Sequence, residues 1–557
     1  MSRSRNAAAP EAMGGRMKPL MKPWPWGVVA AILIELAFGM LAGADGFGGV
    51  GVVALDSGPI RGTTQDGVGA LLGIPYAAPP VGGLRWRPPQ QPAPWTGVLE
   101  ATSFGPACPQ TGPLEAASSE DCLYLNVWTP ARQPGVSGTS GASGAKLPVM
   151  VWLHGGGFNF GAASQQEYHG RNLAGQGVVV VTVNYRLGPL GYLAHPALAA
   201  ESPEGMTGNY GLLDQIESLR WVRRNIAAFG GDPDTVTIFG QSAGSRSVSL
   251  LTLSPLCAGL FHRASAQSGG PIIGSEYLTP AFNGDREAVS RMGRELSARL
   301  GCAKAADELA CLRAKAAMAV VRAADCKTGL FEDGLFFAPV FDGQALPQNP
   351  AATYAAGSQR RVPMIVGSTG NEGASYLRGE SGLTLGKYED FLKARFGAKA
   401  GEAQAMFPAS GDADVAGAID RFITVAVNAQ PARLMARALE RAGSAAFLYR
   451  FTRTPDTARA RELGAFHGVD LAYVFGNMSE ADGYTATDRE LSRQVMAYWV
   501  NFARTGDPNG PGLPPWPAYR TASDDSLEFA DTVRAGKDLY KQQCDFIDRV
   551  SRFELAR

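Results

Sequence analysis

The chain has 557 residues, of which 45% are hydrophobic and 18% are charged, a balance typical of a globular protein. Basic and acidic residues number 51 each, so the formal net charge is zero. No net field would recruit nucleic acid or an anionic surface, and we expect no nucleic-acid partner.

The N-terminal segment has the composition of an export signal. Basic residues at 3–22 precede an apolar run at 26–40, and the small residues 42–44 follow as a cleavage site. The run is short for a membrane span, so we expect a signal peptide over residues 1–44, cleavage near Ala44, and a secreted or periplasmic protein with no stable membrane span. Because Glu35 interrupts the run, a retained membrane anchor is the alternative.

Apolar runs of strand length alternate with helical patterns along the rest of the chain. This order is typical of a parallel sheet with right-handed crossovers, and we expect one α/β domain over residues 45–557. An alanine- and charge-rich stretch at 279–343 predicts a helical insertion. Strands are expected at 119–128, 149–153, 178–183, 236–240, 362–367 and 446–451, and helices at 212–229, 243–253 and 492–504.

Three glycines follow the buried strand expected at 149–153. They are Gly155, Gly156 and Gly157, directly after His154. Glycines at a strand end leave backbone N–H groups uncovered, and such groups can hold an anion. This stretch is therefore a candidate oxyanion hole.

The run at 236–240 ends in Gly-x-Ser-x-Gly, centred on Ser242. A serine on a tight strand-to-helix turn needs neighbours without bulk, and Gly240 and Gly244 occupy those positions. Ser242 is the candidate nucleophile. The alternative for the motif by itself is an ordinary small-residue turn.

A serine nucleophile needs a histidine base, and the chain has only five histidines. The strand-to-helix architecture predicts the order serine, acid, histidine, which leaves His262 and His467. His262 has the setting of a helix-face residue, whereas His467 lies in a small-residue turn, so we expect His467 to be the base. For the acid, Glu372 follows the strand expected at 362–367, and Asp470 remains a rival.

Taken together, these stretches resemble type-B carboxylesterases of the α/β-hydrolase fold, the group that includes bacterial para-nitrobenzyl esterases, fungal lipases and cholinesterases. The resemblance covers nearly the whole mature chain. It is carried by residues 73–80, 120–126, 154–157, 225–233, 240–244, 267–269, 372–373 and 467–468.

The resemblance implies a central, mostly parallel sheet flanked by helices, and a site that uses no cofactor or metal. It implies a triad of Ser242, Glu372 and His467, with the N–H groups of Gly155, Gly156 and Ala243 as the oxyanion hole. It also implies two disulfides, which join Cys108 to Cys122 and Cys302 to Cys311. The pairing of Cys257, Cys326 and Cys544 stays open.

Two departures from the family pattern replace carboxylates by amides. Gln241 stands where the family usually has glutamate, and Asn371 where it has aspartate. The stretch between Cys108 and Cys122 also lacks the tryptophan with which cholinesterases bind choline. These three departures argue against cholinesterase activity.

We therefore expect a serine carboxylesterase that hydrolyses small-molecule carboxylic esters through an acyl-enzyme. The same apparatus would suit a lactone, carbamate or polyester substrate, and a non-catalytic adhesion module of the same fold is a remote alternative. Phe331, Phe336 and Phe337 are candidates for the pocket lining, with the core as the alternative, since aromatic residues in such a segment are more often buried. The sequence leaves the oligomeric state and the physiological ester open.

Overall fold

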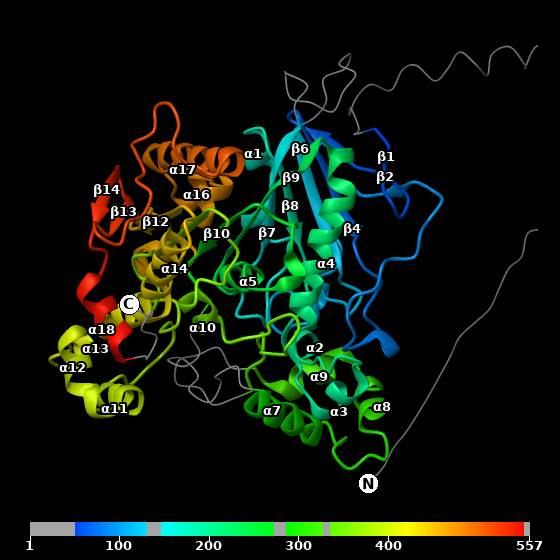
Figure 1. Ribbon diagram of the computed structural model, residues 1–557, viewed down its shortest axis with the longest axis horizontal. Coiled ribbons are helices and arrows are strands. Elements are labelled where there is room, and N and C mark those ends of the chain that lie inside the picture. The colour runs from blue at the N-terminus through cyan, green and yellow to red at the C-terminus, as the bar shows by residue number, and fades with distance from the viewer. Residues whose placement is uncertain (1–50, 131–145, 272–285, 327–334, 551–557) are drawn as a thin grey trace, which may run out of the picture. The chain divides into compact units, whose positions relative to one another are not determined.

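The computed structural model describes residues 51–130, 146–271, 286–326 and 335–550. The segment with the expected signal peptide and its cleavage site lies outside these residues. An eleven-stranded sheet dominates the described part, in the order β14-β13-β12-β11-β10-β9-β7-β8-β6-β4-β3 (Figure 1). No described helix is both long and apolar enough to span a membrane.

The central strands of the large sheet are parallel, as expected. They are β7 (Leu147–Leu153), β8 (Val179–Val183), β9 (Gly231–Gln241), β10 (Arg263–Gln267), β11 (Met364–Thr369), β12 (Ala446–Phe451) and β13 (Asp525–Phe529). Antiparallel pairs occupy both edges and comprise β3 (Thr63–Gln65), β4 (Val68–Pro75) and β6 (Tyr124–Pro130) on one side and β14 (Val533–Lys537) on the other. A small separate sheet contains β1 (Val53–Ala54), β2 (Pro59–Arg61) and β5 (Leu99–Glu100).

Helices cover both faces of the sheet, which explains why its central strands are apolar without alternation. Alternate residues of β7 belong to different apolar clusters: Val149 and Val151 to one, Met150 and Trp152 to the other. The first cluster includes α4 (Tyr210–Asn225), α5 (Ala243–Leu251) and α14 (Gln430–Arg441). The second includes α16 (Leu471–Phe475) and α17 (Ala486–Thr505).

The expected insertion is mainly helical over residues 286–326, whereas residues 335–343 form neither helix nor strand. It contains α7 (Arg286–Arg299), α8 (Glu308–Arg313) and α9 (Ala317–Ala324), and the Cys302–Cys311 disulfide joins the end of α7 to α8. Four shorter helices are α1 (Arg171–Ala174), α2 (Gly188–Tyr192), α3 (Pro196–Glu201) and α10 (Pro350–Ala355), and α15 (Ala458–Leu463) precedes α16.

A third apolar cluster was not foreseen from the sequence. It is built by α11 (Leu385–Phe396), α12 (Ala400–Met406), α13 (Asp412–Ile423) and α18 (Lys541–Val550). A π-helical segment, Thr424–Ala429, connects α13 to α14. Amphipathic periods predict individual helices, but they do not reveal which helices share a core.

Element boundaries differ from the sequence expectations where capping or cross-links decide them. Helix α17 begins at Ala486 because Thr485 and Asp488 form a capping box, and this polar first turn has little apolar periodicity. Strand β6 begins only at Tyr124, just after Cys122, which is cross-linked to Cys108.

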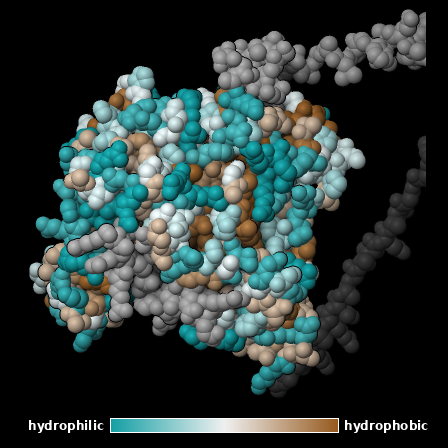
Figure 2. All heavy atoms as spheres, in the orientation of Figure 1, coloured by the Kyte–Doolittle hydropathy of each residue, from teal (hydrophilic) through white to brown (hydrophobic). Residues whose placement is uncertain are grey.

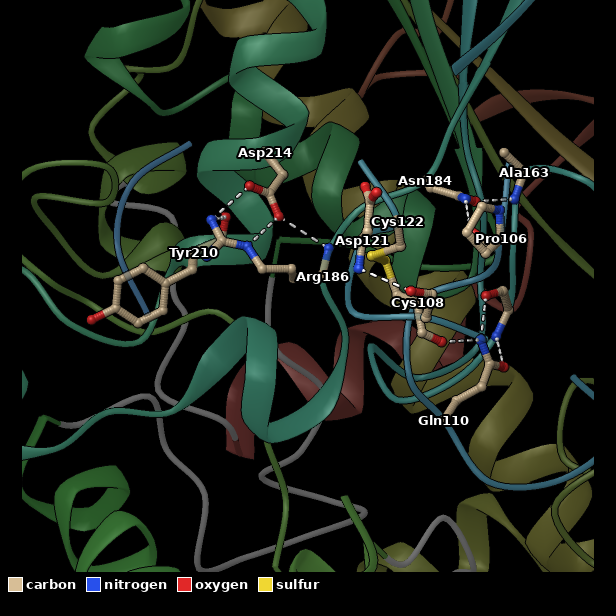
Figure 3. The surroundings of a disulfide bond; sticks show 12 residues. Pro106, Cys108, Gln110, Asp121, Cys122, Ala163, Asn184, Arg186, Tyr210 and Asp214 are labelled. Atoms are coloured by element: carbon tan, nitrogen blue, oxygen red, sulfur yellow. Dashed lines mark hydrogen bonds and ion pairs between the residues drawn. A yellow bond between two sulfur atoms is a disulfide. The ribbon is translucent and has the colours of Figure 1, made fainter. Parts of the chain in front are cut away.

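The Cys108–Cys122 disulfide supports the chain that follows β7 (Figure 3). Next to it, the Gln110 amide donates to the Gly161 carbonyl at 2.9 Å and accepts from the Gly161 N–H at 2.8 Å. Asn184, after β8, accepts from Ala163 N at 2.8 Å. The loop that contains the three glycines is thus held from two sides.

The face in Figure 2 mixes hydrophilic and hydrophobic residues, with the hydrophobic ones in small separate areas. Large hydrophobic side chains that are exposed in the described part of the chain are Val52, Val81, Val98, Phe104 and Phe160. Single exposed hydrophobic residues of this kind are ordinary in globular proteins.

Candidate active site

Ser242 lies on the turn between β9 and α5, with φ 59° and ψ −122°. Its N–H donates to the Gln267 carbonyl on β10 at 2.9 Å. A Cβ at Gly244 would lie 1.9 Å from the Leu153 carbonyl oxygen, and a Cβ at Gly240 would lie 2.6 Å from Gly244. Both glycines are therefore required by close packing, as in a nucleophile elbow.

The glycine run that follows β7 packs directly against this turn. A Cβ at Gly155 would lie 3.0 Å from the Gln241 carbonyl oxygen and 3.1 Å from the Ser242 Cβ. Among the described residues, the N–H groups of Gly155, Gly156 and Ala243 donate no hydrogen bond. Three unpaired donors therefore lie next to the serine, where a developing oxyanion needs them.

His154 shapes this loop. Its ring stacks on Tyr185, with centroids 4.4 Å apart, and the Tyr185 hydroxyl donates to the His154 carbonyl at 2.6 Å. Burial lowers the pKa of His154 to about 4, so the ring is neutral at physiological pH. The residue holds the glycine run in place and does not line the pocket.

His467 and Glu372 meet beside Ser242. The Nδ1 atom of His467 contacts Oε2 of the fully buried Glu372, whose Oε1 accepts from Thr369 N at 2.6 Å. The Nε2 atom of His467 lies 3.1 Å from the side-chain nitrogen of Gln241. Within the described part of the chain the Ser242 hydroxyl has no hydrogen-bond partner, and such catalytic contacts often tighten only when substrate binds.

Asp420 on α13 holds the loop that carries Glu372. It accepts hydrogen bonds from Gly373 N at 2.8 Å, Ala374 N at 3.0 Å and the Asn371 amide at 2.9 Å. The oxygen of the same Asn371 amide accepts from Ala465 N at 3.0 Å, near the histidine. Sequence reasoning missed Asp420, because an acidic residue on an amphipathic helix looks like part of a solvated face.

Thr424 completes the support of Glu372. Its hydroxyl accepts from Glu372 N at 3.0 Å and lies at the start of the π-helical segment. A π-helical turn is a frequent feature of functional sites because it re-aims side chains within a helix. No pattern in the sequence indicated this turn.

The rival residues lie elsewhere. Asp470 accepts from the Tyr449 hydroxyl at 2.9 Å and from the Gln267 amide at 3.3 Å, and burial raises its pKa to about 6. The Nδ1 atom of His262 accepts from Val236 N at 3.2 Å, at the beginning of the elbow strand. The structure thus pairs His467 with Glu372. Neither the rival acid Asp470 nor the rival base His262 takes part in that contact.

A pocket of about 900 Å³ opens over Ser242 and His467. Phe336 lines it, Phe337 is buried in the core instead, and Phe331 lies outside the described residues. The wall also contains residues that the sequence did not single out: Gln165, Arg246, Ser375, Tyr376, Arg378, Arg459, Asn477 and Tyr484. The Tyr376 ring lies 5.8 Å from the His467 ring.

The fold and this constellation define the class as a serine hydrolase of the α/β-hydrolase type. A family model described as the carboxylesterase family matches residues 50–547, and the chain belongs to this family. It is 36% identical over 497 residues to a fumonisin B1 esterase from Sphingopyxis macrogoltabida, covering 87% of each chain. It is 35% identical to the para-nitrobenzyl esterase of Bacillus subtilis (strain 168), covering 86% of this chain and 94% of that one.

Solved structures agree with the sequence comparison. The structure of a PNB esterase matches with a TM-score of 0.75 and 34% sequence identity, covering 89% of this chain and 99% of the other. The protein is therefore an esterase that hydrolyses carboxylic esters, as the sequence predicted.

Proposed function

We propose that Ser242, His467 and Glu372 form the catalytic triad of this esterase, with the N–H groups of Gly155, Gly156 and Ala243 as its oxyanion hole. The observation that supports this assignment most strongly is the contact between His467 and the buried Glu372, beside a serine on a strained elbow. The oxyanion hole is supported by three N–H groups next to that serine that donate no hydrogen bond to any described residue.

The contact between Gln241 and His467 supports the protonation state that the reaction needs. The Gln241 nitrogen can only donate, so Nε2 of His467 must accept and its proton must be on Nδ1, facing Glu372. A histidine in this tautomer has its lone pair on Nε2, which accepts from Gln241 in the substrate-free protein and must exchange that contact for the serine hydroxyl when the reaction begins. The proton on Nδ1 is therefore already on the nitrogen that the proposed reaction needs.

The proposed reaction proceeds through an acyl-enzyme. His467 takes the proton from Ser242 while the serine oxygen attacks the ester carbonyl, and the three N–H groups stabilise the oxyanion. The alcohol leaves with the proton from His467. Water, activated by the same histidine, then releases the acid and restores the serine. No metal or cofactor takes part in the proposed steps.

Titration with an organophosphate tests this proposal. We expect one equivalent to label Ser242 and abolish hydrolysis of a nitrophenyl ester, and we expect Ser242→Ala to lower turnover by roughly 10⁶-fold. Ser245→Ala is the matched control, because Ser245 lies on the same helix but donates to the Gly269 carbonyl. Absence of both labelling and activity in the unmodified protein would reject the triad and favour a non-catalytic role.

We also propose that residues 1–44 are an export signal and that residues 45–557 form one mature domain. The two disulfides support an extracellular or periplasmic location, since such bonds persist in oxidising compartments. The intact mass of the protein from its native host decides between cleavage near Ala44 and a retained anchor. A mass that includes the N-terminal segment would contradict the signal peptide.

A further inference from the structure

Arg246 is a charged residue of the pocket wall that has no partner in the described part of the chain. It lies one helical turn after Ser242 on α5 and is partly buried. Among the described residues, no carboxylate lies within ion-pair distance of its guanidinium, and the guanidinium donates no hydrogen bond. Other enclosed arginines are paired: Arg85 with Glu120, Arg186 with Asp214 and Arg433 with Asp524.

An enclosed, unpaired guanidinium is costly to the folded protein. Burial lowers the pKa of Arg246, although an arginine remains protonated at any physiological pH. The cost of desolvating a charge is recovered only when an opposite charge or acceptors satisfy it. The described part of the protein supplies no such group, and an anion bound in this pocket would satisfy the guanidinium.

The groups that face Arg246 support an anion in this position. The phenol of Tyr376 interacts electrostatically with Arg246, and its ring also lies beside His467. The positive end of α5 is close by, and Gln241 adds no charge. Glu372 is already engaged by His467, so it does not neutralise the arginine.

The other charged residues of the pocket lie farther out. Glu167 and Asp482 are exposed, Glu380 is partly exposed, and the exposed Arg378 pairs with Glu462 at 3.3 Å. Arg459 is also exposed. It stacks on Phe466, with its guanidinium carbon 4.3 Å from the ring centroid, and has no carboxylate within ion-pair distance in the described part. The carboxylates are thus on the outer part of the pocket. Of the two arginines that have no carboxylate partner in the described part, Arg246 is the one near the nucleophile.

We propose that Arg246 binds a carboxylate of the substrate, so that this esterase prefers esters that carry a free carboxylate, such as half-esters of short dicarboxylic acids. The inference rests on the proposed function of Ser242. Four residues of α-helix span about 6 Å, which places the guanidinium within reach of a carboxylate a few carbons away from the ester carbonyl. A planar guanidinium pairs well with a carboxylate because it can donate two parallel hydrogen bonds.

The kinetic test compares two esters of equal length and shape. Monoethyl adipate carries a terminal carboxylate, and ethyl 6-methylheptanoate carries an isopropyl group in its place. We expect the unmodified enzyme to prefer the half-ester, and Arg246→Met to lower the ratio of the two kcat/KM values by about 10- to 100-fold. The loss should appear mainly in KM, and high salt should weaken the preference in the unmodified enzyme.

Two further variants make the result specific. Arg246→Lys keeps the charge and should retain part of the preference. Arg378→Met removes an arginine of the same pocket that already has a carboxylate partner, so it should retain the ratio. Hydrolysis of the neutral ester by each variant shows that the protein is folded. An unchanged ratio in Arg246→Met, or no preference in the unmodified enzyme, would overturn the proposal.

A binding measurement tests this inference separately from the proposed triad. In Ser242→Ala, calorimetry should detect binding of monoethyl adipate. The additional change Arg246→Met should weaken this binding by a factor similar to that expected for the ratio of kcat/KM values. If turnover is absent in the unmodified protein but this binding persists, the anion site stands and the triad assignment fails. If both esters are hydrolysed equally and the half-ester does not bind preferentially, the triad stands and the anion site is wrong.

Discussion

At the scale of single residues, the amide of Gln241 connects the proposed nucleophile to the proposed base. It precedes Ser242 and contacts Nε2 of His467 at 3.1 Å. A glutamate here would place a carboxylate in the pocket that Arg246 also lines. The neutral amide therefore affects which substrate charge the pocket accepts, as well as the orientation of the histidine.

Changing Gln241 to glutamate tests this electrostatic role. We expect Gln241→Glu to raise the kcat/KM of a cationic ester, such as ethyl 6-aminohexanoate, relative to a neutral ester of equal length, because opposite charges attract in a partly enclosed site. Gln241→Met is the control, since it removes the amide without adding charge. An unchanged ratio of cationic to neutral turnover in Gln241→Glu would contradict the prediction.

The second amide substitution, Asn371, has a structural explanation. Its nitrogen donates to Asp420 and its oxygen accepts from Ala465 N, so one side chain ties the Glu372 loop to the chain near His467. An ionised aspartate at this position could not donate to Asp420 and would repel it. The amide thus positions the loop, and it is not part of the pocket lining.

Asp470 gives a pH dependence of stability. Burial raises its pKa to about 6 in the folded protein, above the value of 3.8 for an unperturbed aspartate. Between these values the folded state holds the proton and the unfolded state does not, so this residue makes the free energy of unfolding fall as pH rises. We expect Asp470→Asn to remove this fall, which amounts to up to about 3 kcal/mol between pH 4 and pH 7. The measurement is the free energy of unfolding by urea, determined for both proteins across this pH range.

Tyr449→Phe provides a comparison for this prediction. It removes the hydroxyl that donates to Asp470 and leaves the carboxyl in place. The remaining carboxyl should then titrate at a higher pH, and the pH-dependent fall in stability should become larger. Identical pH slopes in the unmodified and Asp470→Asn proteins would show that the carboxyl is ionised throughout.

At the scale of elements, the glycine loop depends on support from the Cys108–Cys122 loop. Gln110 lies in that loop and forms two hydrogen bonds with Gly161, beyond the three glycines. Within the described residues, the N–H groups of Gly155 and Gly156 have no hydrogen-bond partners that would fix their direction. Their direction is therefore maintained by neighbouring elements, the disulfide loop and Asn184 among them.

Removing this disulfide should affect both stability and catalysis. We expect the double change Cys108→Ala and Cys122→Ala to lower the free energy of unfolding by about 3 kcal/mol and to reduce kcat, because the loop behind the oxyanion hole loses its cross-link. The Cys302–Cys311 bond is a matched control of similar loop length, with sequence separations of 9 and 14. Its removal should cost stability and leave kcat unchanged; equal losses of kcat would contradict the supporting role.

At the scale of the whole molecule, the C-terminal helix α18 closes a core that supports the site. Its residues Cys544, Phe546 and Ile547 are buried in the third cluster, beside the π-helical segment that contacts Glu372 through Thr424. Two ion pairs join α14 to α18: Arg433 pairs with Asp545, and Arg437 pairs with Asp548. The last described helix is therefore an integral part of the fold.

Truncating one buried side chain of α18 measures this contribution. Phe546 is fully buried and its ring lies 5.6 Å from that of Phe396. We expect Phe546→Ala to cost about 3–5 kcal/mol in the free energy of unfolding, determined by denaturant titration. Arg549→Ala on the same helix removes an exposed ion pair with Glu402 and should cost at most about 1 kcal/mol. Equal costs would mean that α18 is not packed into the core.

The sequence by itself determined the features that depend on local chemistry. Continuous apolar runs predicted the parallel strands, and the small residues at Gly240 and Gly244 predicted the elbow around Ser242, because a tight turn restricts which side chains fit. The scarcity of histidines pointed to His467. The family resemblance then predicted the esterase class, which the comparisons confirm.

Only the tertiary structure decided which distant groups meet. Glu372 and Asp470 were both candidates by position. Packing of their two loops at the carboxyl ends of the central strands brings Glu372 to His467, whereas Asp470 contacts Tyr449. The same packing leaves Arg246 without a carboxylate partner among the described residues. Contacts between segments far apart in the chain follow from strand order, register and helix packing, and no local pattern of residues encodes them.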